Sequence, residues 1–163
     1  MKGVDWVTSI TDRPSCTCVT DERISTLATI TVSAKDHATR VGLVDAAARY
    51  RIESTGHWTD WWVKTDALGY TSKAVQALFE KFRIVPNARW FALCGVLAPP
   101  TANNDEVLNL VRTESFDLSP FIATEDWWVP SQTAILFVFP NDVYSAYWNN
   151  SGAIEIAVTR ELA

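Results

Sequence analysis

The stretch TAILFVFPNDVYSAYWNNSGAIEIAVT, residues 133–159, contains two different strand patterns joined by a polar segment. Its first part, TAILFVF, is a nearly continuous apolar run rich in β-branched and aromatic residues, which is typical of a central strand covered on both faces. In its last part, AIEIAVT, the apolar residues Ile154, Ile156 and Val158 share one face. Glu155 lies on the opposite face, so this part predicts a strand with one buried side.

Similar stretches elsewhere in the chain predict further strands. Residues 27–34 (LATITVSA) and 48–54 (ARYRIES) alternate between apolar and polar positions, whereas residues 89–98 (RWFALCGVLA) form another apolar run. Gly, Pro, Asn and Asp residues separate these segments and indicate turns. Many short strands with regular turns predict an all-β fold, a β-sandwich of the jelly-roll type.

One short helix is predicted between the strands. Ser72 is a suitable N-cap, and Pro86 fixes the end of the helix. The apolar residues with helical spacing are Val75, Leu78, Phe79 and Phe82. We therefore predict one β-sandwich domain over residues 27–163, preceded by residues 1–26 as an N-terminal arm or an extra edge element.

Composition and charge exclude several classes of protein. The chain has 163 residues, of which 48% are apolar and 20% are charged, as is typical of a globular domain. Its formal net charge is −5 and its Lys and Arg residues are scattered, so we expect neither a nucleic-acid partner nor binding to an anionic membrane. No apolar stretch approaches the roughly 20 residues of a membrane span, and we expect no membrane insertion.

The start of the sequence and the cysteines bear on location. No apolar segment follows Lys2, so no secretory signal peptide is predicted. The location stays open between the cytoplasm and non-classical release. The chain has three cysteines, Cys16, Cys18 and Cys94, and an odd number does not indicate a disulfide framework. A structural zinc site is also disfavoured, because it needs about four N or S ligands and the chain has only two histidines. A reducing compartment is the natural expectation.

The polar segment 141–152 carries the candidate functional residues. Asp142, Asn149 and Asn150 place three oxygen-bearing side chains within nine positions. Calcium takes about six to eight oxygen ligands from carboxylates, amides and backbone carbonyls. Gly152 permits the bend that would turn both Asn side chains toward one ion. The alternative interpretation is an Asx-turn within an ordinary hairpin loop.

This segment resembles the signature of a known lectin family. The pattern NDV…YWNNSGAIEIAV, residues 141–158, is similar to the C-terminal signature of the LecA-like (PA-I type) bacterial lectins, which bind galactose through calcium. Residues 29–61 resemble the opening of that family, FALCGVL its middle strand, and TAILFVFPNDV the strand that leads into the site. The resemblance covers about residues 27–163 in order, except for an atypical stretch at roughly 70–89.

The resemblance implies a Ca²⁺ site as the cofactor site of this chain. The residues whose side chains would bind calcium are Asp142, Asn149 and Asn150. Ala146 would bind it through its backbone carbonyl, at a position where the family has Thr. A further carbonyl is expected from the turn near residue 60. It comes from Trp61 in the favoured alignment or from Asp60 in the alternative one.

The resemblance also implies contacts with a sugar. Two adjacent hydroxyls of galactose or a related sugar would complete the calcium shell. Asp142 and Asn149 would also hydrogen-bond to the sugar, and Val143 would line the pocket. Since no bond is broken in such binding, no acid–base pair is needed.

The chain departs from the family in the ligand contacts. The family's His-Pro-x-Gln stretch is replaced by KTDALGYTS, residues 64–72, where Asp66 or Tyr70 would have to supply the contacts. Trp148 stands where the family has Gly, and it would either stack on the sugar or partly block the site. His57 is a further candidate ligand contact, with a loop histidine of no such role as the alternative.

The sequence therefore predicts a calcium-dependent carbohydrate-binding protein without enzymatic activity. A homo-oligomer is expected, because multivalency compensates for weak binding at a single site. The alternative is a non-catalytic interaction or structural module of the same fold that has lost sugar binding. Glu125 and Asp126 superficially suggest the paired carboxylates of a glycosidase, but adjacent residues diverge on a strand, and we interpret them as a solvated loop.

Overall fold

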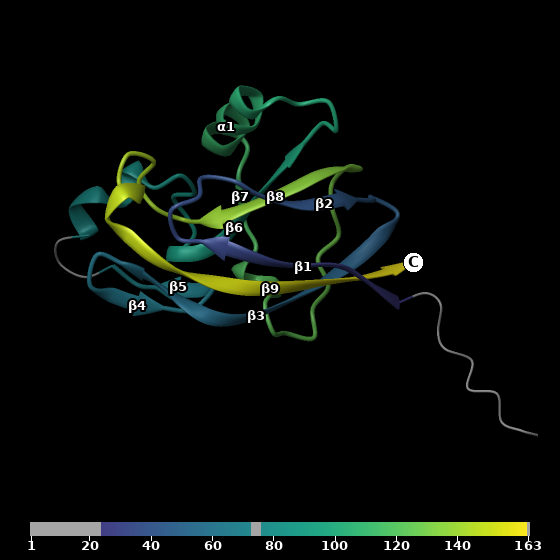
Figure 1. Cartoon of the computed structure of the whole chain (residues 1–163), viewed down its shortest axis with the longest axis horizontal. Coiled ribbons are helices and arrows are strands. Elements are labelled where there is room, and N and C mark those ends of the chain that lie inside the picture. Colours follow the sequence, from purple (N-terminus) through teal and green to yellow (C-terminus); the bar gives the residue numbers. More distant parts are fainter. Residues whose placement is uncertain (1–23, 73–75, 163) are drawn as a thin grey trace, which may run out of the picture.

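Two antiparallel sheets pack face to face and form a β-sandwich (Figure 1). The computed structural model describes residues 24–72 and 76–162. One sheet has the strand order β1-β9-β3-β4, and the other has the order β2-β8-β6-β5, with β7 also paired to β6. The strands are β1 (Ile24–Ser33), β2 (Thr39–Val44), β3 (Ala48–Asp60), β4 (Val63–Thr65), β5 (Leu68–Tyr70), β6 (Trp90–Ala98), β7 (Phe116–Asp117), β8 (Ala134–Pro140) and β9 (Asn150–Leu162). The predicted all-β sandwich is confirmed.

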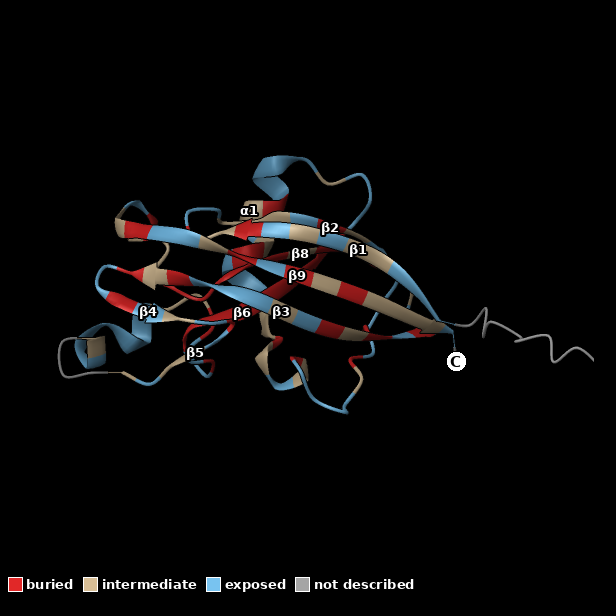
Figure 2. Cartoon of the chain, turned by 60° about the horizontal axis from the view of Figure 1, so that its bottom comes forward, coloured by how far each residue is buried: buried red, intermediate tan, exposed pale blue. Residues whose placement is uncertain are grey.

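Strand β9 occupies an inner position of the four-stranded sheet, between β1 and β3. The residues of β9 that are buried in the core between the sheets are Ile154, Ile156 and Val158. Glu155 is exposed, so the predicted alternation is confirmed. Figure 2 shows buried and less buried residues following one another along this strand.

Strands β6 and β8 are covered on both faces, as their continuous apolar runs predict. The residues of β6 that face the other sheet are Phe91, Leu93 and Leu97. The residues of β6 that join a second cluster, on the outside of the sheet, are Ala92, Cys94 and Val96. Val111 of helix α1 (Asn104–Thr113) packs in this second cluster. Helix α1 therefore covers the outer face of the five-stranded sheet (Figure 1).

The short helix predicted after Ser72 is present as a 3₁₀ helix and not as an α-helix. Residues 76–82 form a 3₁₀ helix, η1 (Gln76–Phe82), which has no buried residues. Its apolar residues Leu78, Phe79 and Phe82 are exposed, because α1 and residues 84–88 already cover the outer face of the sheet. Val75 lies outside the described residues.

The α-helix lies instead at residues 104–113, where only turn residues were expected. Its start carries a capping box, in which Asn103 accepts from the backbone N–H of Glu106 and the carboxylate of Glu106 accepts from the backbone N–H of Asn103. The pattern Asn-x-x-Glu before apolar residues is a helix signal that the sequence contains. The other short helices are η2 (Ser119–Phe121) and η3 (Tyr147–Asn149). No helix in the described part of the chain is long and apolar enough to cross a membrane.

We expect replacement of Ile156 by Ala to destabilise the fold strongly. Ile156 is fully buried between the sheets, and removal of such a side chain costs about 2–5 kcal/mol. The Tm measured by circular dichroism is expected to fall by roughly 5–15 °C. Glu155→Ala, on the exposed face of the same strand, is the control and should change the Tm by less than about 2 °C. Equal effects of the two substitutions would contradict the alternation of β9.

Candidate functional site

Three segments that are distant in the sequence meet at one end of the sandwich. They are the turn between β3 and β4, the segment 141–149 that follows β8, and the start of β9. In Figure 1 this end lies opposite the C-terminal end of β9. The segment after β8 finishes in the 3₁₀ helix η3, so the backbone is irregular next to the two Asn residues, as the predicted site requires.

Gly152 provides the predicted bend at the start of β9. Its φ angle is +83°, in the left-handed region that favours glycine. A Cβ at this position would lie 2.9 Å from the carbonyl oxygen of His57 on the neighbouring strand. The bend therefore requires glycine both for its backbone angle and for the close approach of β3.

Asn141 anchors the site segment to the loop before β6. Its side chain is fully buried, and its Oδ1 accepts from the N–H of Val85 at 2.9 Å. Its Nδ2 donates to the carbonyls of Val85 at 2.9 Å and Arg89 at 3.0 Å. The carbonyl of Asp142 accepts from the N–H of Ile84 at 3.1 Å. These bonds fix the backbone of Asp142 without using its carboxylate.

The carboxylate of Asp142 is buried beside Asn150. Its Oδ1 accepts from the N–H of Val143 at 2.6 Å, and its Oδ2 accepts from Nδ2 of Asn150 at 2.9 Å. The same Nδ2 donates to the carbonyl of Ala34 at 3.2 Å, which orients the amide of Asn150. The Oδ1 atoms of Asn149 and Asn150 are buried and have no hydrogen-bond partner among residues 24–72 and 76–162. Unpaired buried acceptors are costly, and amide oxygens are atoms that calcium binds.

A pocket of about 260 Å³ opens beside these groups. The predicted site residues that line it are Trp61, Asp142, Val143, Ala146, Trp148 and Asn149. Asn150 joins them through its bond to Asp142. The structure therefore brings together the side chains that the polar segment contributes and the turn between β3 and β4.

Two predicted ligand residues lie outside the pocket. His57 is exposed on β3, because the alternation of the strand turns Trp58 and Asp60 inward and His57 outward. Asp66 is exposed in the turn between β4 and β5, where its Oδ1 accepts from the N–H of Leu68 at 2.9 Å. Neither side chain lines the pocket, and these placements argue against ligand contacts by His57 and Asp66.

Three tryptophans at the pocket are exposed. Trp61 and Trp62 form the turn between β3 and β4, and Trp148 belongs to η3; their exposed fractions are 64%, 56% and 79%. The rings of Trp61 and Trp62 lie 4.2 Å apart. Trp61 has a φ angle of +51°, which is costly for a residue other than glycine. Backbone strain together with exposed aromatic surface is typical of a binding site.

A second carboxylate, that of Asp60, also lines the pocket. It is 7% exposed, and its Oδ2 accepts a hydrogen bond from the hydroxyl of Tyr70. The oxygen of Tyr70 accepts in turn from Nε2 of Gln76 at 3.5 Å. Tyr70 lies on β5 of the other sheet, so its bond to Asp60 joins both sheets at the pocket.

Several lining residues were not predicted from the sequence. They are Trp62, Gln76, Phe79, Trp90 and Ser145, and for Asp60 only the backbone carbonyl was considered. Gln76 and Phe79 come from η1, within the stretch that is atypical of the family. Trp62 carried a signal, since a Trp-Trp pair between two strands is expected to be exposed at a turn.

Burial raises the pKa of both carboxyl groups. The pKa of Asp142 is raised to about 6, chiefly by desolvation and also by the negative charge of Asp60, against the opposing effect of the hydrogen bonds from Asn150 and Val143. Desolvation also raises the pKa of Asp60, against the opposing effect of the bond from Tyr70. A pocket that disfavours negative charge in this way gains from a bound cation.

The oxygen donors in the pocket fit a hard cation. Those of lining residues are the carboxylate of Asp142, the amide oxygen of Asn149 and the carbonyl of Ala146, and the amide oxygen of Asn150 belongs to the neighbour that bonds to Asp142. The Ala146 carbonyl accepts from the N–H of Asn149 at 3.1 Å and keeps a second lone pair. Within residues 24–72 and 76–162, no group of three or more His, Cys, Asp or Glu side chains is placed to hold a metal. A cation here would therefore depend on amide and carbonyl oxygens, which suit calcium and not zinc.

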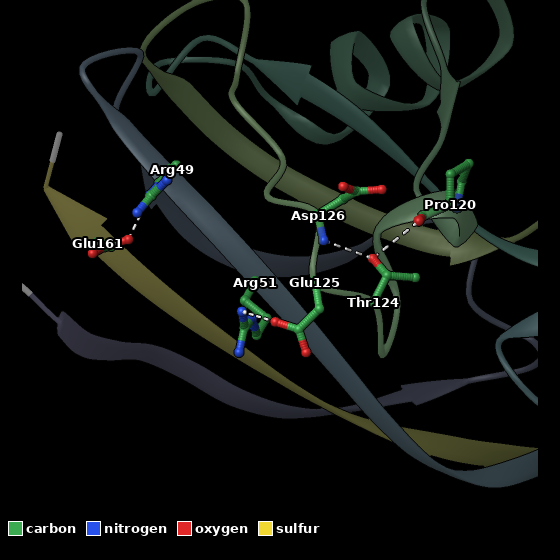
Figure 3. Close-up of polar contacts among 7 residues, drawn as sticks. All are labelled: Arg49, Arg51, Pro120, Thr124, Glu125, Asp126 and Glu161. Atoms are coloured by element: carbon green, nitrogen blue, oxygen red, sulfur yellow. Dashed lines mark hydrogen bonds and ion pairs between the residues drawn. The ribbon is translucent and has the colours of Figure 1, made fainter.

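Glu125 and Asp126 do not form a carboxylate pair. Figure 3 shows their side chains pointing in different directions. Glu125 is 99% exposed and forms an ion pair with Arg51 at 3.4 Å. The backbone N–H of Asp126 donates to the hydroxyl of Thr124 at 3.3 Å. The interpretation of this segment as a solvated loop is confirmed.

The fold is similar to that of a solved lectin domain. A structure described as the EclA N-terminal domain, a PllA-like lectin, matches with a TM-score of 0.54 and 17% sequence identity, over 83% of this chain and 98% of that chain. The chain has the fold of that domain. No protein family and no curated protein matches the sequence. At this identity the likeness establishes the fold, and the LecA-like type with its calcium and galactose stays a prediction.

We expect Asp142 to make the stability of the cation-free protein depend on pH. Its pKa is raised from 3.8 to about 6 in the folded protein, so the folded protein binds this proton more tightly than the unfolded chain does. The resulting penalty is absent below pH 3.8 and fully present above about pH 6, and stability from this group falls as the pH rises. In EDTA, Asp142→Asn is expected to reduce the fall in Tm between about pH 4.5 and about pH 7 by roughly 5 °C.

The control for this experiment is Asp126→Asn, which removes an exposed carboxylate. We expect its pH profile to follow that of the unmodified protein. An Asp142→Asn profile that also follows the unmodified protein would show that Asp142 is not the group that titrates.

Proposed function

We propose that this protein binds carbohydrate through a calcium ion held in the pocket at the start of β9. The observation that carries the proposal is the pair of buried amide oxygens, on Asn149 and Asn150, beside the buried carboxylate of Asp142. In the part of the chain that the structure describes, neither oxygen has a hydrogen-bond partner. Folded proteins rarely leave such atoms unpaired without a ligand, ion or water to use them. The lectin fold of the solved neighbour and the LecA-like resemblance of residues 141–158 support the same proposal.

The residues of the pocket have separate tasks in this proposal. When bound, calcium would supply free coordination positions for two adjacent hydroxyls of a sugar. Asp142 accepts hydrogen bonds from sugar hydroxyls, and the amide of Asn149 can donate to them. Val143 supplies apolar surface at the wall. Binding of this kind breaks no covalent bond, so the proposed function is not enzymatic.

The exposed tryptophans supply the apolar side of the proposed sugar site. Among the described tryptophans, Trp58, Trp90 and Trp128 are buried, whereas the three that are mainly exposed all line this pocket. An indole ring offers a flat surface on which the C–H face of a pyranose can lie. Trp148 is the most exposed of them and stands where the LecA-like signature has Gly. In this proposal the indole of Trp148 adds an aromatic contact that a glycine cannot make.

Galactose or a related sugar is the proposed ligand, and a homo-oligomer is the proposed functional form. The preference for galactose rests on the resemblance of the calcium-binding segment alone. Several copies of one site on an oligomer would raise the avidity for a surface that carries many sugars. A panel of monosaccharides tests the first point, and the mass in solution tests the second.

A second candidate is an interaction module that keeps the fold and the cation but binds protein. The observation that favours it is the apolar surface of η1, where Leu78, Phe79 and Phe82 are 74%, 48% and 54% exposed. Phe79 also lines the pocket. Contiguous exposed apolar surface of this kind marks partner sites as well as ligand sites.

We expect calcium and then galactose to raise the Tm in two steps. A ligand that binds only the folded protein at about 100 times its Kd adds about 2.7 kcal/mol, which corresponds to roughly 5–10 °C for a domain of this size. The measurement is thermal unfolding in EDTA, in calcium, and in calcium with galactose. A rise with calcium and none with any sugar would favour the interaction module.

Asn149→Ala provides the variant for this experiment. Its Oδ1 makes no hydrogen bond in the described structure, so its removal should leave the Tm in EDTA within about 2 °C of the original. The rise with calcium is expected to be lost. Asn109→Ala, on the exposed side of α1, is the matched control and should keep the full rise. Retention of the rise in Asn149→Ala would remove Asn149 from the proposed site.

We expect Trp148→Ala to weaken sugar binding and to leave calcium binding unchanged. Loss of one aromatic stacking contact corresponds to about 0.5–1.5 kcal/mol, or roughly a 2–12-fold increase in Kd. Isothermal titration of galactose into the calcium-saturated protein measures the change. Phe82→Ala is the control, since Phe82 is exposed nearby but does not line the pocket. Tighter sugar binding by Trp148→Ala would show that the indole blocks the site.

A further inference from the structure

We propose that the carboxylate of Asp60 is a direct ligand of the cation, so that two carboxylates face the ion. This inference rests on the proposed function and adds to it. The resemblance assigns only a backbone carbonyl to residue 60 or 61, and only one charged side chain, that of Asp142, to the site. The side chain of Asp60 has no role in that assignment.

The register of the sheet brings Asp60 to the site. Asp60 and Asn150 are the last directly opposed pair between β3 and β9. Directly opposed residues of an antiparallel pair project from the same face, with Cβ atoms about 4.5–5.5 Å apart. Asn150 in turn donates to the carboxylate of Asp142 at 2.9 Å. Asp60 and Asp142 are therefore both neighbours of Asn150.

The amide between them carries an independent sign of a ligand. Asn150 is 1% exposed, and its Oδ1 is buried without a partner. Its Nδ2 is fully used by Asp142 and by the carbonyl of Ala34, so a flip of the amide would lose both bonds. The oxygen is thus left as a buried acceptor on the amide that bonds to Asp142, and a cation can satisfy it.

The charge of the pocket also requires a positive partner. Asp60 and Asp142 are 7% and 2% exposed, and in the described part of the chain no Lys, Arg or His side chain forms an ion pair with either of them. Two buried like charges without compensation are strongly disfavoured. One divalent cation neutralises both, whereas a site with Asp142 alone would leave the ion with an excess positive charge.

Tyr70 holds Asp60 in a position that leaves one oxygen free. The Tyr70 hydroxyl donates to Oδ2 of Asp60, and no hydrogen bond to Oδ1 is present among the described residues. Asp60 lines the pocket together with Asp142 and Asn149. The free oxygen is therefore available to an ion in the pocket.

Calcium titration of three charge-neutralising variants tests this inference. Asp60→Asn removes the charge but keeps the size of the side chain and an oxygen that can accept from Tyr70. Asp142→Asn removes the charge of the second carboxylate and likewise keeps the size of its side chain. Asp66→Asn is the matched control, because Asp66 is an exposed carboxylate outside the pocket. We expect calcium Kd values from isothermal titration to rise by roughly 10–100-fold or more for the first two variants, and to stay within about twofold for Asp66→Asn.

The outcomes separate this inference from the proposed function. If Asp60→Asn binds calcium like the unmodified protein while Asp142→Asn does not, Asp60 is not a ligand and the proposed function stands. If the unmodified protein takes up no calcium, the proposed function itself fails. If Asp60→Asn does not fold, the side-chain carboxyl ¹³C resonance of Asp60 in the unmodified protein decides: a shift with calcium that Asp66 does not share supports the inference, and no shift overturns it.

Discussion

The register between β3 and β9 is the constraint on which the site depends. The apolar residues of β9 face the core, so the strand cannot slide by one position without moving all of them toward solvent. The same register sets Asn150 opposite Asp60 at the end of the ladder, where the Asn150 amide reaches Asp142. The hydrophobic core therefore determines which polar groups meet in the pocket, although Ile154, Ile156 and Val158 do not line it.

The pocket gathers features that folding ordinarily avoids. It contains buried carboxylates, amide oxygens without partners, a tryptophan in the left-handed region and exposed indole rings. The surroundings keep these features in place. Asn141 uses its amide to join the site segment to the loop before β6, and apolar clusters lie on both faces of β6 and β8. The frame thus holds polar groups in place that an added ion or ligand would stabilise, as in a preorganised site.

The strands were predictable because alternation and continuous apolar runs are local properties of the sequence. The sequence could single out segment 141–152 as a candidate site because its oxygen donors lie close together along the chain. The helix was misplaced because spacing alone does not tell whether a sheet face is free: η1 has the apolar spacing but α1 covers the sheet. The roles of Asp60 and Gln76 were out of reach, since they follow from pairing with Asn150 and from the position of β5.

The inner position of β9 also has a consequence for biosynthesis. β1 and β3 are synthesised before β9, yet each of them pairs with β9 and not with the other. In the described sheet β1 has no other strand neighbour, and β3 has only the short strand β4 beside it, until the ribosome has passed β9. Until then both present open edges that can pair with other nascent chains. A chaperone that shields strand edges would therefore act on this chain before β9 is complete.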